Sequence, residues 1–130
     1  MSLKQELMQF TGTMQYHKIT SFSKLVVTDG ILYLCEKAKC YWLIDVVVSV
    51  QHLRKVNEHK EFLIWKIYKS KTGGKGCRVD AYWDSEEDGT FSVGKLIYSQ
   101  KIGYTTFPFD ELGEFEFYQE NDVLLLKGEH

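Results

Sequence analysis

Apolar residues follow two different periods along the chain, and the change from one to the other divides it into two parts. Between Leu3 and Val56 many apolar residues recur every three or four positions, which is typical of helices packed on a core. From Glu61 onward apolar and polar residues alternate, as in strands with one buried face. Only Gly12 and Gly30 lie in the first part, and the other eight glycines lie beyond residue 72. The pattern predicts an α+β protein with helices first and strands after.

Residues that can cap a helix predict two helices near the N-terminus. Ser2 can accept a hydrogen bond from the first turn of a short helix whose apolar face lies within 3–10. The dipeptide Thr28-Asp29 can do the same for a second helix, because apolar residues recur at helical spacing over 31–38. Between these helices the segment 15–27 fits either state, and a short strand at 25–27 is one alternative.

A third helix is predicted over 41–56. Its valine triplet at 46–48 also suits a strand, but the apolar stripe persists for about fifteen residues, longer than ordinary strands. The stripe consists of Trp42, Val46, Ser49, Val50, Leu53 and Val56. Asp45 lies inside this apolar run, and if it were buried it would need hydrogen-bond donors around it.

The second part predicts strands at 63–68, 79–83, 96–102, 115–118 and 123–127. The glycine-rich turn at 72–76 joins the first two strands in a hairpin. Its alternation places Trp65 with Val79, Ala81 and Trp83 on the helix side of the sheet, and Lys66, Tyr68 and Asp80 on the other side. We therefore predict one domain, 1–130, in which N-terminal helices (1–57 being mainly helical) pack on one face of a four- or five-stranded antiparallel β-meander (58–130).

The composition indicates which partners and which cellular compartment to expect, but it does not indicate an activity. The 130 residues carry a net charge of −2, so overall charge does not favour nucleic acid or an anionic membrane. The most apolar run, 41–50, is half as long as the roughly twenty residues that a membrane span needs, and no signal peptide is visible. Three cysteines, Cys35, Cys40 and Cys77, are too few for a disulfide framework. We expect a cytoplasmic protein with reduced thiols and no membrane partner.

Several motifs fail a test of spacing, so no catalytic, cofactor-binding or metal-binding residue is predicted. The acidic run 84–89 begins like a calcium loop, but Lys95 stands where the loop needs a bidentate glutamate. Asp45 and His52 would lie about 10 Å apart along a helix, too far for a catalytic triad with Ser49. Neither a zinc pattern nor a phosphate-binding loop is complete.

The first hairpin carries a cluster of cations that could bind nucleic acid. No acidic residue lies between positions 62 and 79, and Trp65 and Tyr68 are interleaved with the basic residues Lys66, Lys69, Lys71, Lys75 and Arg78. Lysines beside stacking rings are typical of surfaces that bind single strands. The competing interpretation is that edge lysines protect an exposed hairpin from aggregation while Trp65 lies in the core. We favour the second.

Five runs resemble a known family. They are FTGT at 10–13, TDG at 28–30 with Leu34, YWLID at 41–45, YTTFP at 104–108 and NDVLLL at 121–126. In this order they resemble a family of short bacterial proteins, common in cyanobacteria and on phage or plasmid-like elements, that is known only as a domain of unknown function. The resemblance implies one complete domain and no particular activity.

Three functions stay open. The leading hypothesis is a non-catalytic binding or interaction protein, for example an accessory factor of a mobile element, with a protein partner or a second copy bound through an exposed edge strand. The second is weak nucleic-acid binding through the basic hairpin. The third is a small enzyme whose site is assembled from scattered residues such as His17, Asp45 and Tyr104. No cofactor is expected.

Overall fold

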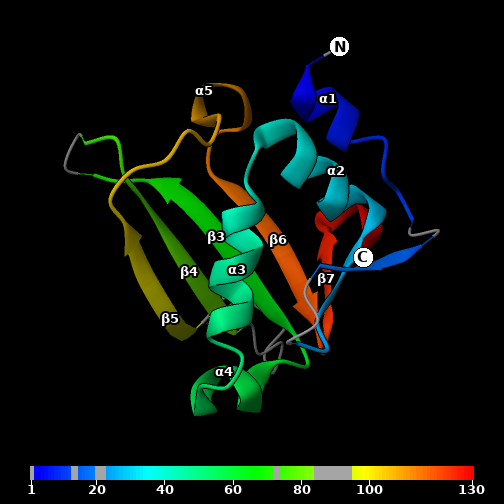
Figure 1. Ribbon diagram of the computed structural model, residues 1–130, viewed down its shortest axis with the longest axis vertical. Coiled ribbons are helices and arrows are strands. Elements are labelled where there is room, and N and C mark those ends of the chain that lie inside the picture. The colour runs from blue at the N-terminus through cyan, green and yellow to red at the C-terminus, as the bar shows by residue number, and fades with distance from the viewer. Residues whose placement is uncertain (1, 13–14, 20–22, 72–73, 84–94) are drawn as a thin grey trace.

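Seven strands form one mixed sheet in the computed structural model, which describes residues 2–12, 15–19, 23–71, 74–83 and 95–130 (Figure 1). The strands are β1 (Tyr16–Lys18), β2 (Val26–Thr28), β3 (Leu63–Lys69), β4 (Cys77–Trp83), β5 (Lys95–Ile102), β6 (Phe115–Glu120) and β7 (Val123–Leu126). Their order across the sheet is β1-β2-β7-β6-β3-β4-β5. The pairing of β2 with β7 is parallel, and the others are antiparallel.

The predicted α+β class is confirmed, whereas the four- or five-stranded antiparallel meander is wrong. β6 pairs with β3, not with the strand before it, so the chain returns across the β3–β4 hairpin between β5 and β6. The two additional strands, β1 and β2, have three residues each, too few to show a period of two. The segment 15–27 fits either state by its sequence, with a short strand at 25–27 as one alternative, and β2 occupies almost that position.

The helices are α1 (Leu3–Leu7), α2 (Asp29–Ala38), α3 (Tyr41–Ser49), α4 (Arg54–His59) and α5 (Phe109–Leu112), and a 3₁₀ turn, η2 (Lys127–Glu129), ends the chain. Both predicted caps are confirmed: the Ser2 side chain accepts from the Gln5 amide, and that of Thr28 accepts from the Ile31 amide. Lys39 ends α2 in the left-handed conformation, with φ of 55°.

The single helix predicted over 41–56 is interrupted after α3. The Val47 carbonyl accepts hydrogen bonds from the Val50 amide and from the Gln51 side chain, so the last turn tightens and the helix ends. The buried face of α3 consists of Leu43, Ile44 and Val47, one position away from the predicted stripe. Asp45 is exposed.

The predicted register of the first hairpin is confirmed. Trp65 pairs with Ala81 and Lys66 with Asp80, and the Trp65 side chain is fully buried. α2 and α3 lie on one face of the sheet (Figure 1), and their buried side chains belong to the same core cluster as Trp65 and Ala81. This face is called the helix face below, and the face that carries Lys66 and Asp80 is called the opposite face.

One buried amide, that of Gln119 in β6, joins three elements of the core. Its oxygen accepts from Trp65 Nε1 at 3.0 Å and from Gln51 Nε2 at 3.2 Å. Its nitrogen donates to Gln51 Oε1 at 2.7 Å and to the Asn121 carbonyl at 2.8 Å. Gln119 is 0% exposed, so these bonds replace all contact of its side chain with water.

The C-terminal turn is part of the core and holds the start of α2. Glu129 is buried, and its carboxylate accepts from the Thr28 hydroxyl at 2.6 Å, the Gly30 amide at 3.2 Å and the Leu126 amide at 3.0 Å. A Cβ atom on Gly30 would lie 2.5 Å from this carboxylate, so a side chain at this position would displace the Glu129 carboxylate. No helix in the described residues is long and apolar enough to cross a membrane.

Candidate functional site

The five predicted basic residues of the hairpin lie on both faces of the sheet. Lys66 and Arg78 are on the opposite face, where Lys66 Nζ lies 3.1 Å from Glu114 Oε2 and Arg78 donates to the Ser99 hydroxyl at 2.9 Å. Lys69 shares the helix face with Trp65 by alternation along β3. The structure therefore does not gather the five cations into one patch.

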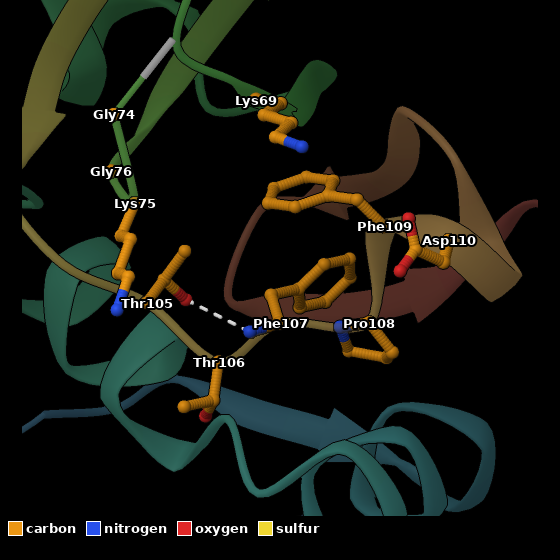
Figure 2. A pocket seen from close by; sticks show the side chains of 10 residues that line it. All are labelled: Lys69, Gly74, Lys75, Gly76, Thr105, Thr106, Phe107, Pro108, Phe109 and Asp110. Carbon is orange, nitrogen blue, oxygen red and sulfur yellow. Dashed lines mark hydrogen bonds between the residues drawn. The ribbon is translucent and has the colours of Figure 1, made fainter.

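Two of these cations, Lys69 and Lys75, line a pocket of about 460 Å³ at the turn of the hairpin (Figure 2). The far wall is the segment that follows β5. The lining residues are Lys69, Gly74, Lys75, Gly76, Thr105, Thr106, Phe107, Pro108, Phe109 and Asp110. We call this space the hairpin pocket. Lys71 is exposed in the same turn but is not among the lining residues.

Backbone contacts hold the two walls of the hairpin pocket together. The Thr105 amide donates to the Lys75 carbonyl at 2.9 Å, and the Thr105 hydroxyl accepts from the Phe107 amide at 3.0 Å. Gly76 is buried, and a side chain there would collide with the Ile102 carbonyl oxygen at the end of β5. Glycine at this position therefore lets the segment after β5 approach the turn closely.

Aromatic rings form the floor of the hairpin pocket. Phe107 is buried, and its ring centroid lies 5.0 Å from that of Phe109 and 6.3 Å from that of Phe115. Phe109 is half-buried and turns its ring toward the space below Lys69 (Figure 2). The ring beside Lys69 is therefore that of Phe109 (Figure 2), whereas Trp65 is buried in the core and the Tyr68 ring lies on the opposite face, with its centroid 5.8 Å from Lys66 Nζ.

Cys77 lies at the start of β4, next to the wall of the hairpin pocket. Burial raises the pKa of its thiol to about 11, although a hydrogen bond with Thr105 lowers it somewhat. The thiol is therefore protonated at neutral pH and is a poor nucleophile. Cys35, Cys40 and Cys77 are all free and buried, as expected for reduced thiols, and the contact with Cys40 together with burial raises the pKa of Cys35.

The opposite face has a polar cluster around Asp80, which is only 2% exposed. Its carboxylate accepts hydrogen bonds from the hydroxyls of Tyr68 at 2.8 Å and Tyr82 at 2.9 Å, and from that of Ser99. Burial and this carboxylate raise the pKa of Tyr82 to about 12, and they raise the pKa of Tyr68 as well. Both phenols therefore act as neutral donors, and the cluster connects β3, β4 and the edge strand β5.

The scattered residues considered for an enzyme lie on different elements. His17 in β1 contacts Asp29 with an Nε2–Oδ1 distance of 2.7 Å, Asp45 is exposed on α3, and Tyr104 is 64% exposed after β5. In the described part of the chain no three His, Cys, Asp or Glu side chains are grouped as metal ligands would be. The acidic run 84–89 lies outside the described residues.

Sequence reasoning missed the second wall of the hairpin pocket. Thr105, Thr106, Phe109 and Asp110 are far from the hairpin along the chain, and only the pairing of β4 with β5 brings their segment back to it. The same register places Lys101 opposite Arg78. The YTTFP run at 104–108 was visible in the sequence, but its composition indicates a loop and not where that loop lies.

Comparison with known proteins identifies a family and no function. A family model described as "Family of unknown function (DUF6876)" matches residues 1–130. No curated protein and no solved structure matches the chain. The hairpin, the segment after β5 and the pocket between them all lie within the matched residues, and the chain belongs to this family of unknown function.

Proposed function

We propose that the protein is a non-catalytic binding protein and that the hairpin pocket is its binding site for an anionic ligand. One observation carries this proposal: two lysines, Lys69 and Lys75, line the same pocket as two threonines, Thr105 and Thr106. Asp110 is the one acidic residue among the lining residues, so the pocket has a net positive charge.

The lining residues suit an anionic ligand. Lysine ammonium groups form charge-assisted hydrogen bonds with the oxygens of a phosphate or a sulfonate. Threonine hydroxyls can donate further bonds to the same oxygens. The volume of about 460 Å³ lies within the range of small-molecule sites, roughly 300–1,000 Å³.

Chemical inertness of the neighbouring groups supports binding without catalysis. The raised pKa of Cys77 keeps the thiol beside the pocket protonated, and the phenols with raised pKa values lie on the opposite face of the sheet. A role as an accessory factor of a bacterial mobile element stays a prediction, which the neighbouring genes would test.

Calorimetric titration with inorganic phosphate and pyrophosphate tests the proposal. We expect weak binding of pyrophosphate at low salt that falls as salt rises, because exposed charges are screened. Lys69→Gln and Lys75→Gln should each weaken binding several-fold. Lys71→Gln is the matched control, since it removes the same charge from the same turn but outside the pocket.

Two results would overturn the anion site. One is the absence of binding at low salt. The other is an equal loss of affinity in all three variants, which would show that only the overall charge of the hairpin matters. If instead the lysine variants bind normally but aggregate, the lysines protect an exposed hairpin.

The second candidate function is binding of a protein partner through β5. This strand has eight residues and lies at the edge of the sheet, and Leu96 on it is 50% exposed. Long exposed edges pair readily with other strands, including those of a second copy. Light scattering on the parent protein and on Leu96→Lys tests it: an oligomer that the substitution dissociates supports an edge interface, and a monomer at all concentrations excludes self-association.

A further inference from the structure

We infer that the anionic ligand of the hairpin pocket is a nucleoside monophosphate unit, either free or within a single strand. The inference rests on the proposed function and deepens it. It assigns the phosphate to Lys69 and Lys75, the base to the ring of Phe109, and a donor-bearing edge of the base to Asp110.

The aromatic floor indicates that the ligand has a planar part. An inorganic anion needs only cations and hydroxyls, but the ring of Phe109 is half-buried and lines the same pocket as both lysines. Its contact with Phe107, at 5.0 Å between centroids, fixes the ring from below. A fixed ring next to cations is what proteins use to stack a base whose phosphate is held nearby.

The acidic residue on the lining gives the ligand an orientation. Asp110 follows Phe109 directly and lines the same pocket, and Figure 2 shows its carboxylate near the backbone of Phe109, at the end of the pocket away from Lys75. A carboxylate only accepts hydrogen bonds, so it repels phosphate and attracts an amino group. Adenine, cytosine and guanine carry such an amino group on their edges, whereas uracil does not. The pocket therefore has cations for the phosphate of a nucleotide and a carboxylate for the amino group of its base.

A cation beyond the pocket suits a ligand that continues as a strand. Lys71 is exposed in the same turn but does not line the pocket. A single strand with one nucleotide in the pocket would place a neighbouring phosphate near Lys71. A free nucleotide has no such second phosphate, so replacing Lys71 should weaken binding of a strand and leave binding of a free nucleotide unchanged.

Calorimetric titrations with four compounds test the inference: cytidine 5′-monophosphate, uridine 5′-monophosphate, ribose 5-phosphate and inorganic pyrophosphate. We expect cytidine monophosphate to bind about 10- to 100-fold more tightly than ribose 5-phosphate, since stacking of one base contributes this much. Phe109→Leu should remove most of that difference. Asp110→Asn should reduce the preference for cytidine over uridine monophosphate while raising affinity for pyrophosphate, because a negative charge is lost.

The controls distinguish binding of a nucleotide from binding of any anion. Circular dichroism melting checks that Phe109→Leu folds, and Asp110 is exposed, so Asp110→Asn tests the orientation without disturbing the core. If ribose 5-phosphate and pyrophosphate bind as tightly as the nucleotides, the inference is overturned and the anion site stands. If no compound with a phosphate binds, the proposed function fails as well.

A short cytidine oligonucleotide distinguishes the two sources. If it binds more tightly than the mononucleotide, and Lys71→Gln weakens the oligonucleotide alone, the unit belongs to a single strand. If the mononucleotide binds as tightly and Lys71→Gln changes neither affinity, the ligand is a free nucleotide. Loss of both affinities in Lys71→Gln would contradict the assignment of the phosphate to Lys69 and Lys75.

Discussion

Replacing Gln119 with leucine should destabilise the fold through lost hydrogen bonds and not through a cavity. The two side chains have similar volumes, so packing changes little. The amide, however, is the acceptor for the buried Trp65 Nε1–H and the side-chain donor to the Asn121 carbonyl. Gln119→Leu leaves the buried indole N–H without this partner, whereas the half-buried Gln51 and the exposed Asn121 can bond to water instead.

The expected cost is about 1–3 kcal/mol, because this is the usual cost of one buried polar group left unpaired. In urea the midpoint of unfolding should fall by roughly 0.5–1.5 M if the slope is about 2 kcal/mol per molar. Equilibrium unfolding followed by circular dichroism measures this directly.

A double-mutant cycle with Trp65→Phe identifies the cause. Trp65→Phe removes the indole N–H, so Gln119→Leu no longer leaves that donor unpaired. The double variant should therefore lose less stability than the sum of the losses of the two single variants. We expect a coupling of about 1 kcal/mol or more, as is usual for residues in contact. A Gln119→Leu protein within about 0.5 kcal/mol of the parent, the range of ordinary surface changes, would refute the reasoning.

Three further predictions concern other parts of the core. Trp65→Ala should cost about 3–5 kcal/mol in urea unfolding, because the fully buried ring leaves a cavity; a loss below 1 kcal/mol would contradict its place in the core. Gly30→Ala should lower the melting temperature although alanine favours helices, because its Cβ displaces the Glu129 carboxylate; a stabilised variant would exclude that contact. Tyr82 should ionise near pH 12, not near 10, so its contribution to stability is complete below pH 10 and is lost as pH rises toward 12; the difference between the alkaline ultraviolet titrations of the parent and of Tyr82→Phe measures it.

The parts of the fold that were predictable depend on neighbours in sequence. The caps at Ser2 and Thr28 need only a hydroxyl placed before a helix, and the first hairpin needs only alternation around a glycine turn. The interruption of the third helix was not predictable, since Gln51 ends α3 while it also contacts Gln119, a residue far away in the chain.

The same distinction applies to the hairpin pocket. Lys69 and Lys75 were candidates from their local charge, because basic residues cluster visibly in sequence. Phe109 and Asp110 belong to the site only because β5 lies beside β4, and no local pattern specifies which strands are neighbours. Lys66 and Arg78 are also basic, but they lie outside the pocket because side chains alternate along β3 and β4 and these two are on the opposite face.

The parallel pairing of β2 with β7 affects how the protein folds during its synthesis. Val26 pairs with Val123 and Val27 with Leu124, about a hundred residues later in the chain, and Glu129 completes the first turn of α2. Because the ribosome releases the N-terminal end first, β2 and the start of α2 emerge long before their partners exist. The hairpin of β3 and β4 can form locally in the meantime, but the sheet closes only when the last residues are free. Loss of residues 123–129 would therefore destabilise β2 and the start of α2, in the N-terminal half of the molecule.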